Sequence, residues 1–225
     1  MISPDLVQIE AQLESKDCRE RLLALAALRA VPAVDAVPLI KKVLDDEHMP
    51  VRSMAVFSLG VKPTEECYSI LIHLLQTDPD YGIRADAAGA LGYLEDPRAL
   101  EPLVRSFYED TDWLVRFSVA VALGNLKDPR ARDVLLQALE GEEAVLQQAA
   151  IAALGEIKDL EAIDRLLEFA PSDDWLLRLR LAESLGNLPS PKSRSALKFL
   201  AKDSHPNVAR AAKIALEQLA EEGEG

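Results

Sequence analysis

A leucine that recurs every 31 or 32 residues constrains the fold of this chain more than any other feature. The recurring leucines are Leu28, Leu59, Leu91, Leu123, Leu154, Leu185 and Leu216. A glycine directly follows the five inner ones, as in Leu59–Gly60 and Leu123–Gly124. A fixed period of about 20–50 residues is typical of proteins in which one small unit is stacked many times. The sequence therefore predicts a chain of similar units.

Each unit has the pattern of two helices. Val115, Val119 and Leu123 lie at helical spacing before a glycine, and a second apolar stripe follows a short Asp-Pro turn. We predict that the glycine ends the first helix by adopting the left-handed conformation, at Gly60, Gly92, Gly124, Gly155 and Gly186. We also predict that a polar residue caps the start of that helix, with Asp46, Asp78, Asp110, Ser172 and Asp203 as the candidates.

A single helical hairpin cannot bury both of its apolar stripes, so neighbouring hairpins must stack. We predict an all-α solenoid of about 14 helices, arranged as stacked antiparallel pairs with capping end helices. The predicted organisation is one solenoid over 1–225. It consists of an N-terminal capping helix in 1–16 (N-cap Ser3), six helix pairs in 17–202, a closing helix in 203–220 and a frayed tail in 221–225.

The net charge of −13 restricts the partners that this chain can bind. Nucleic acids and anionic membranes are disfavoured, because affinity for both depends on Lys and Arg. No apolar run is long enough to span a bilayer, and the N-terminus lacks the pattern of a signal peptide. We therefore expect a cytoplasmic protein that does not bind nucleic acid or insert into membranes. We expect it to be a monomer or weak dimer and to bind a partner protein with a basic or neutral surface.

An arginine column runs through the repeats, at Arg21, Arg52, Arg84, Arg116 and Arg178. Gln147 and Ala209 interrupt it. In one interpretation each guanidinium bonds an Asp or a loop carbonyl of an adjacent repeat and ties the repeats together. In the other, the column holds a carboxylate ligand, with Arg84, Arg116 and Arg178 as the candidate binding residues.

An aromatic column, Tyr81, Trp113 and Trp175, lies at the start of three first helices. These rings either pack the preceding loop or form exposed anchors for a partner, since Trp and Tyr are enriched at binding hot spots. Asp112 and Asp174 precede the two tryptophans and add acidic groups suited to a partner's Arg or Lys. We predict no catalytic residues and no metal site, because His48, His73 and His205 do not share a register and no catalytic motif is present.

The repeat unit resembles the short HEAT-like repeat of the phycobilin lyase-type family of cyanobacteria. The resemblance is carried by VRFSVAVALGNLKDPRARDVL (115–135) and IRADAAGALGYLEDPRALEPL (83–103). The segment DWLVRFS (112–118) and the chain length are most similar to the NblB and IaiH group of that family. This resemblance implies a cyanobacterial cytosolic protein. It implies contact with a phycobiliprotein and its bilin, phycocyanobilin, or with a cofactor-assembly protein.

Two functions remain open at this point. The first is a non-catalytic scaffold that binds a partner protein. The alternative is a bilin lyase or chromophore-detaching protein acting on phycobiliproteins. In that case Arg84 and Arg116 would hold the propionates of the bilin, and its rings would stack near Tyr81 and Trp113.

Overall fold

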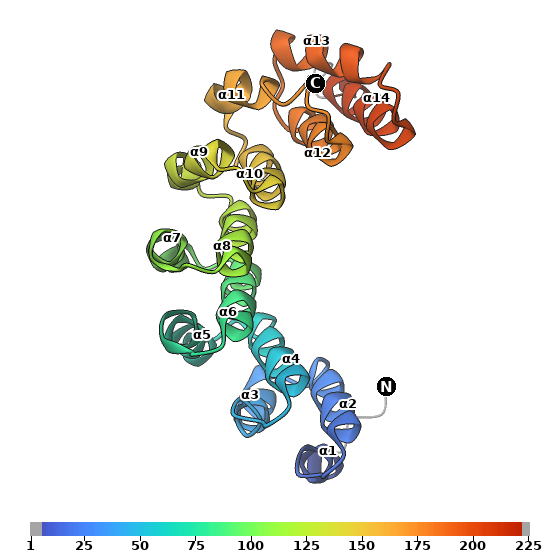
Figure 1. Cartoon of the computed structure of the whole chain (residues 1–225). Coiled ribbons are helices and arrows are strands. Elements are labelled where there is room, and N and C mark those ends of the chain that lie inside the picture. The colour runs from blue at the N-terminus through green and yellow to red at the C-terminus, as the bar shows by residue number, and fades with distance from the viewer. Residues whose placement is uncertain (1–5, 222–225) are drawn as a thin grey trace. The chain divides into compact units, whose positions relative to one another are not determined.

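The computed structural model describes residues 6–221, which form fourteen α-helices, three short 3-10 helices and no strand (Figure 1). This confirms the predicted all-α class and the number of helices. The chain divides into two compact units, Met1–Ala122 and Leu123–Gly225, with the boundary inside one helix, α8. The predicted single solenoid over the whole length stays a prediction.

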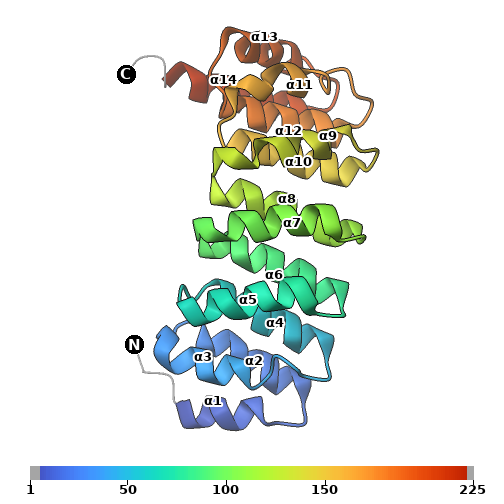
Figure 2. The same cartoon turned by 90° about the vertical axis from the view of Figure 1, so that its left-hand side faces the viewer.

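The first unit is built from two layers of helices. In both views α2, α4 and α6 lie side by side in one layer, and α3, α5 and α7 lie in the other (Figures 1 and 2). Helix α1 packs on α2 where we predicted a capping helix. The elements are α1 (Leu6–Leu13), α2 (Cys18–Leu28), α3 (Ala33–Lys41), α4 (Met49–Gly60), α5 (Glu65–Thr77), α6 (Tyr81–Leu94), η1 (Pro97–Ala99), α7 (Leu100–Glu109) and α8 (Trp113–Leu126).

The second unit repeats this arrangement. Helix α12 packs between α10 and α14, while α11 contacts α13. The elements are η2 (Pro129–Ala131), α9 (Arg132–Glu140), α10 (Ala144–Glu156), η3 (Leu160–Ala162), α11 (Ile163–Leu167), α12 (Trp175–Gly186), α13 (Pro191–Leu200) and α14 (Pro206–Glu221). Helix α14 lies where we predicted the closing helix. The predicted N-cap Ser3 and tail residues 222–225 lie outside the described residues. No helix within 6–221 combines the length and the apolar character needed to cross a membrane.

The repeating leucines form the core of the first-helix layer. Leu59, Leu91, Leu123, Leu154 and Leu185 are fully buried. Burying a leucine side chain contributes about 1.5–3 kcal/mol, so one leucine per unit at a fixed register stabilises every first helix in the same way.

Helices α4 and α12 end at Gly60 and Gly186 as predicted, but the left-handed conformation predicted for the glycines is wrong. Helix α6 continues past Gly92 to Leu94, and no glycine among the described residues has a positive φ. The left-handed positions are instead Glu95, Lys127 and Lys158, with φ of 52–54°. Gly60 serves close packing: a Cβ built there would lie 2.8 Å from the Cα of Ala90 in the next first helix. A glycine is required at this position because α4 and α6 touch there. The sequence of α4 alone does not reveal this contact.

The predicted helix caps are displaced by two residues. Helix α6 is capped by Asp80, whose side chain accepts from the N–H of Gly82, and α12 is capped by Asp174. The predicted cap Asp78 lies two residues before Asp80 and accepts from the N–H of Asp80 at 2.9 Å. At the starts of α6, α8 and α12, two polar residues at spacing two therefore accept successive backbone N–H groups.

Candidate functional site

The arginine column ties successive repeats together. Arg84 donates from Nε and Nη2 to the two carboxylate oxygens of Asp110, at 2.7 and 3.1 Å, and from Nη1 to the carbonyl of Asp78. Arg178 makes the same bidentate pair with Asp203, at 2.7 and 3.0 Å. Since Nε, Nη1 and Nη2 of both side chains are engaged, this geometry favours the interpretation that Arg84 and Arg178 are structural.

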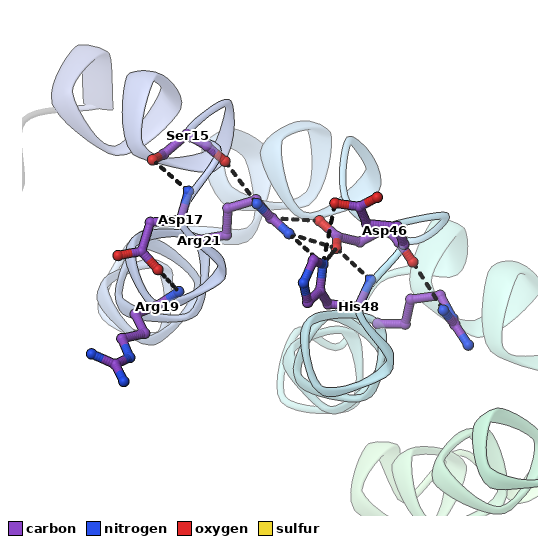
Figure 3. Close-up of polar contacts among 8 residues, drawn as sticks. Ser15, Asp17, Arg19, Arg21, Asp46 and His48 are labelled. Atoms are coloured by element: carbon purple, nitrogen blue, oxygen red, sulfur yellow. Dashed lines mark hydrogen bonds and ion pairs between the residues drawn. The ribbon is translucent and has the colours of Figure 1, made fainter.

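The same link occurs at the N-terminal end, where Figure 3 shows Arg21 reaching from α2 to the loop before α4. Its Nε lies 2.7 Å from Asp46, and its Nη1 donates to the carbonyl of Ser15 at 2.7 Å. Its Nη2 also lies 3.1 Å from Nδ1 of His48. Arg52 continues the series and contacts Asp80. The same Arg–Asp link between neighbouring repeats therefore recurs at Arg21, Arg52, Arg84 and Arg178.

Gln147 shows how the column tolerates an interruption. Its Nε2 donates to the carbonyls of Leu139 and Gly141, at 3.1 and 2.7 Å. Leu139 lies in the last turn of α9 and Gly141 in the loop that follows it, and the backbone partners of Arg84 and Arg178 also lie in the preceding loop. Arg116, the remaining candidate of the column, is half-buried in the first turn of α8.

These ion pairs change the titration of the acids that accept them. The hydrogen bond from Arg178 holds the pKa of Asp203 below its ordinary value, against the opposing effect of burial. Asp203 therefore stays ionised in the folded protein to lower pH than a free carboxyl group.

The aromatic column splits into two kinds of position. Tyr81 and Trp113 are exposed, at 53% and 54% of their surface, and Met49 at the equivalent position is 38% exposed. Trp175 is half-buried and stacks on the ring of His205, with centroids 4.0 Å apart and planes at 12°. Trp175 thus packs a loop, whereas Tyr81 and Trp113 present their rings to solvent.

The acidic neighbours of the tryptophans are helix caps. Oδ1 of Asp112 accepts from the N–H of Leu114 at 2.9 Å, and Oδ1 of Asp174 accepts from the N–H of Leu176 at 2.8 Å. Both side chains are half-buried. Their charge lies beside the aromatic rings, but one oxygen of each is already used by the fold.

Two open clefts adjoin the arginine links, one in each unit. Arg84 borders a cleft of about 360 Å³ beside α5 and α7, and Arg178 borders one of about 560 Å³ beside α13. The first is lined by Leu75, Gln76, Pro102, Arg105, Ser106 and Asp110. The clefts were not predicted, because they form between helices that are about 30 residues apart in the chain.

The sequence interpretation also missed an aromatic pair on another face. Phe57 of α4 and Tyr93 of α6 meet edge to face, with ring centroids 5.8 Å apart and planes at 84°. Both rings are exposed, and Asp86 lies on the same helix as Tyr93. The available signal was their departure from the repeat pattern, since no neighbouring unit has an aromatic residue at the position of Tyr93. Across residues 6–221, no group of three or more His, Cys, Asp or Glu side chains could hold a metal ion.

Solved structures of other proteins share this fold. The complex of CpcE and CpcF of phycocyanin lyase from Nostoc sp. PCC7120 is 22% identical, with 97% of each chain covered and a TM-score of 0.62. An engineered protein is 21% identical over 97% of this chain and 98% of its own, with a TM-score of 0.53. A chain from the structure of Kap95p with RanGDP is 16% identical over 96% of this chain and 35% of its own, with a TM-score of 0.63. Identities this low show a common fold alone.

Comparison with curated protein sequences finds no match. The sequence does match the family model for HEAT repeats, in three overlapping stretches at residues 6–91, 68–154 and 132–217. These stretches together cover nearly all of the helices described above. The chain therefore belongs to the HEAT repeat family.

Proposed function

We propose that this chain is a non-catalytic scaffold that binds a partner protein through an aromatic ridge. The ridge consists of Met49, Tyr81 and Trp113, at the starts of α4, α6 and α8. The observation that carries the proposal is the exposure of a large apolar side chain at the same position of three successive repeats. The fold does not need these exposed rings, and rings of this kind dominate the energetics of protein interfaces.

The surroundings of the ridge favour a partner with basic groups. The N-cap carboxylates of Asp80 and Asp112 directly precede Tyr81 and Trp113. The net charge of the chain is −13, so approach of a basic surface is electrostatically favoured. Met49 is also held in place, because its side chain packs against Gly82, where an added Cβ would lie 2.5 Å from its Cε.

We further propose that the partner is a phycobiliprotein or a cofactor-assembly protein. The repeat resembles the phycobilin lyase-type family, and the fold is similar to that of CpcE and CpcF. Both likenesses support a phycobiliprotein or a cofactor-assembly protein as the partner, with the complex formed in the cytoplasm. A long repeat surface suits this task, since it can contact a partner without a deep pocket.

A second candidate function, bilin lyase or chromophore-detaching activity with phycocyanobilin as ligand, has the same two likenesses in its favour. Its weakness is that the guanidinium of Arg84 is already paired with Asp110. A bilin propionate would have to compete with that carboxylate. The test is to add the protein to phycocyanobilin and record the visible spectrum: a shift supports this function, and an unchanged spectrum at saturating protein argues against it.

The scaffold proposal is tested by changing the ridge alone. The variant Tyr81→Ala/Trp113→Ala removes two exposed rings, and Tyr108→Ala removes an equally exposed tyrosine on α7 as a matched control. Partners captured from a cyanobacterial lysate are identified, and their affinities are then measured with purified components. One hot-spot ring contributes about 2 kcal/mol or more, which is about thirtyfold in affinity, so we expect the double variant, which loses two rings, to bind several hundredfold more weakly. Equal affinity of the double variant and the control would remove the ridge from the proposal.

A further inference from the structure

Four residues on the surface formed by α4 and α6 do not follow the repeat. They are Phe57, Asp86, Gly89 and Tyr93, here called the α4–α6 patch. The positions equivalent to Asp86 hold Met54, Ser118, Ala149 and Arg180. Because the same fold forms with such different residues at that position, the solenoid does not require a carboxylate there.

The geometry of the patch leaves its centre bare. A Cβ built on Gly89 would meet nothing within 4 Å, so the backbone of α6 is open to an approaching group at this point. The edge-to-face pair of Phe57 and Tyr93 stands beside it, with 40% and 58% of these side chains exposed. Close packing of Gly60 on Ala90 fixes α4 against α6 at the same level. The patch is therefore preorganised and not dependent on a loop.

Asp86 has an unsatisfied carboxylate oxygen. Its Oδ2 is buried, and no side chain or backbone group in the described part of the chain donates a hydrogen bond to it. Burial raises the pKa of Asp86, although a hydrogen bond from Ser53 opposes the effect. A partly buried carboxylate without a full set of donors is a costly arrangement that a cationic donor relieves.

Elsewhere in the chain, an arginine is bound by an aromatic ring and carboxylates together, which is the kind of contact that would satisfy the carboxylate of Asp86. The guanidinium of Arg98 lies 4.4 Å from the centroid of the Tyr68 ring. The same guanidinium contacts Asp96 at 2.6 Å and Glu65 at 2.8 Å. An aromatic face and a carboxylate thus hold one arginine together on this fold, as expected for a planar cation that both stacks and donates. The α4–α6 patch has the aromatic rings and the carboxylate without the arginine.

We propose that the α4–α6 patch binds the side chain of an arginine in a basic segment of a partner protein. The aliphatic stem lies over Gly89 beside the aromatic pair, and the guanidinium donates to the carboxylate of Asp86. Asp86 and Tyr93 are seven residues apart, which is about 10 Å along a helix and within the reach of one arginine and its backbone. The terminal torsion of Asp is soft, so a small rotation brings Oδ2 to the surface. This inference rests on the proposed scaffold function only in taking a protein segment as the occupant.

The test uses a blocked Gly-Arg-Gly-Arg-Gly peptide and the same peptide with citrulline in place of arginine. Citrulline keeps the shape of the side chain and removes its charge. Calorimetry in 150 mM salt, the ionic strength of about 0.15 M at which exposed charges are screened, is expected to show at least tenfold tighter binding of the arginine peptide. Equal affinities of the two peptides would overturn the proposal.

Three variants locate the binding. Asp86→Asn removes the charge and is expected to weaken arginine-peptide binding at least fivefold. Gly89→Leu covers the bare surface at a position where the new Cβ meets nothing within 4 Å, and it is expected to block binding. Ala152→Leu, at the same repeat position in α10, is the matched control and should bind normally. Circular dichroism verifies that each variant is folded. Unchanged affinity in both Asp86→Asn and Gly89→Leu would show that the peptide binds elsewhere and would overturn the assignment.

The ridge variant separates this inference from the proposed function. Tyr81→Ala/Trp113→Ala is expected to bind the arginine peptide normally, whether or not it retains the partner. Loss of peptide binding in that variant would place the arginine on the ridge and would overturn the assignment to the α4–α6 patch.

Discussion

Gly60→Ala tests the finding that a repeat glycine is a packing residue. A terminating glycine in the left-handed conformation and a helical glycine at a contact both resist substitution, but for different reasons. Gly60 is the last residue of α4 and has no positive φ, so the backbone itself accepts alanine. The added Cβ would lie 2.8 Å from both the Cα and the Cβ of Ala90 and 2.9 Å from its carbonyl oxygen.

The magnitude follows from how far α4 and α6 must separate. Ordinary contacts of a Cβ begin at 3.4 Å, and the nearest atom here is at 2.8 Å, so the helices must move apart by about half an ångström or more. Overpacking of this kind costs about 1–3 kcal/mol. Replacing a helical glycine by alanine gains about 1 kcal/mol at most. The expected net effect is a loss of about 1–2 kcal/mol in the free energy of unfolding.

Urea titration monitored by circular dichroism measures this effect. The matched control is Gly89→Ala in the neighbouring helix α6, where the new Cβ meets nothing within 4 Å. That variant is expected to be more stable by about 0.5–1 kcal/mol, because only the helix propensity changes. Adding Ala90→Gly to Gly60→Ala should recover part of the loss, since it removes the Cβ but not the Cα from the contact. If Gly60→Ala and Gly89→Ala shift stability in the same direction by the same amount, the packing explanation is wrong.

Three further substitutions test the electrostatics and the backbone. Arg178→Met should lower the free energy of unfolding by about 2–3 kcal/mol at pH 7, because the largely buried carboxylate of Asp203 loses its cationic partner and keeps only the hydrogen bond from the N–H of His205. The folded pKa of Asp203 is depressed, so this contribution is present above the ordinary carboxyl pKa of 3.8 and is lost as the pH falls below it; an equal difference in urea midpoint at pH 7 and pH 2.5 would contradict this. Lys127→Gly should raise stability by about 0.5–1 kcal/mol, since Lys127 has a φ of 52° that glycine adopts without strain; thermal unfolding measures it, and a lower midpoint would contradict it. Asp86→Asn should raise stability by about 1 kcal/mol at pH 7. The folded pKa of Asp86 is raised, so its ionisation costs stability as the pH rises above 3.8; a gain that persists at pH 3 would refute this cause.

The repeat register predicted the positions of the candidate site residues but not their roles. The register identified the arginine column correctly, but the choice between a structural and a ligand-binding role required distances, such as 2.7 Å from Arg84 to Asp110. The register also treated Trp113 and Trp175 as equivalent. Only the second has a histidine from the following loop against it, His205, and it is therefore half-buried while Trp113 is exposed.

The sequence by itself determined the fold class, because a hydrophobic period of about 31 residues can be buried only by stacking helix pairs. The register also predicted the buried leucines from Leu28 to Leu185, whereas Leu216, in the last helix, is only half-buried. The tertiary structure decided what each exception to the pattern does. Gly60 and Gly89 are both glycines in the same layer of helices. A Cβ at Gly60 would clash with Ala90, whereas a Cβ at Gly89 would meet nothing within 4 Å. The burial of one oxygen of Asp86 was likewise fixed by packing. Such differences depend on how closely a neighbouring helix approaches, and that distance is a property of the packed pair, not of either segment alone.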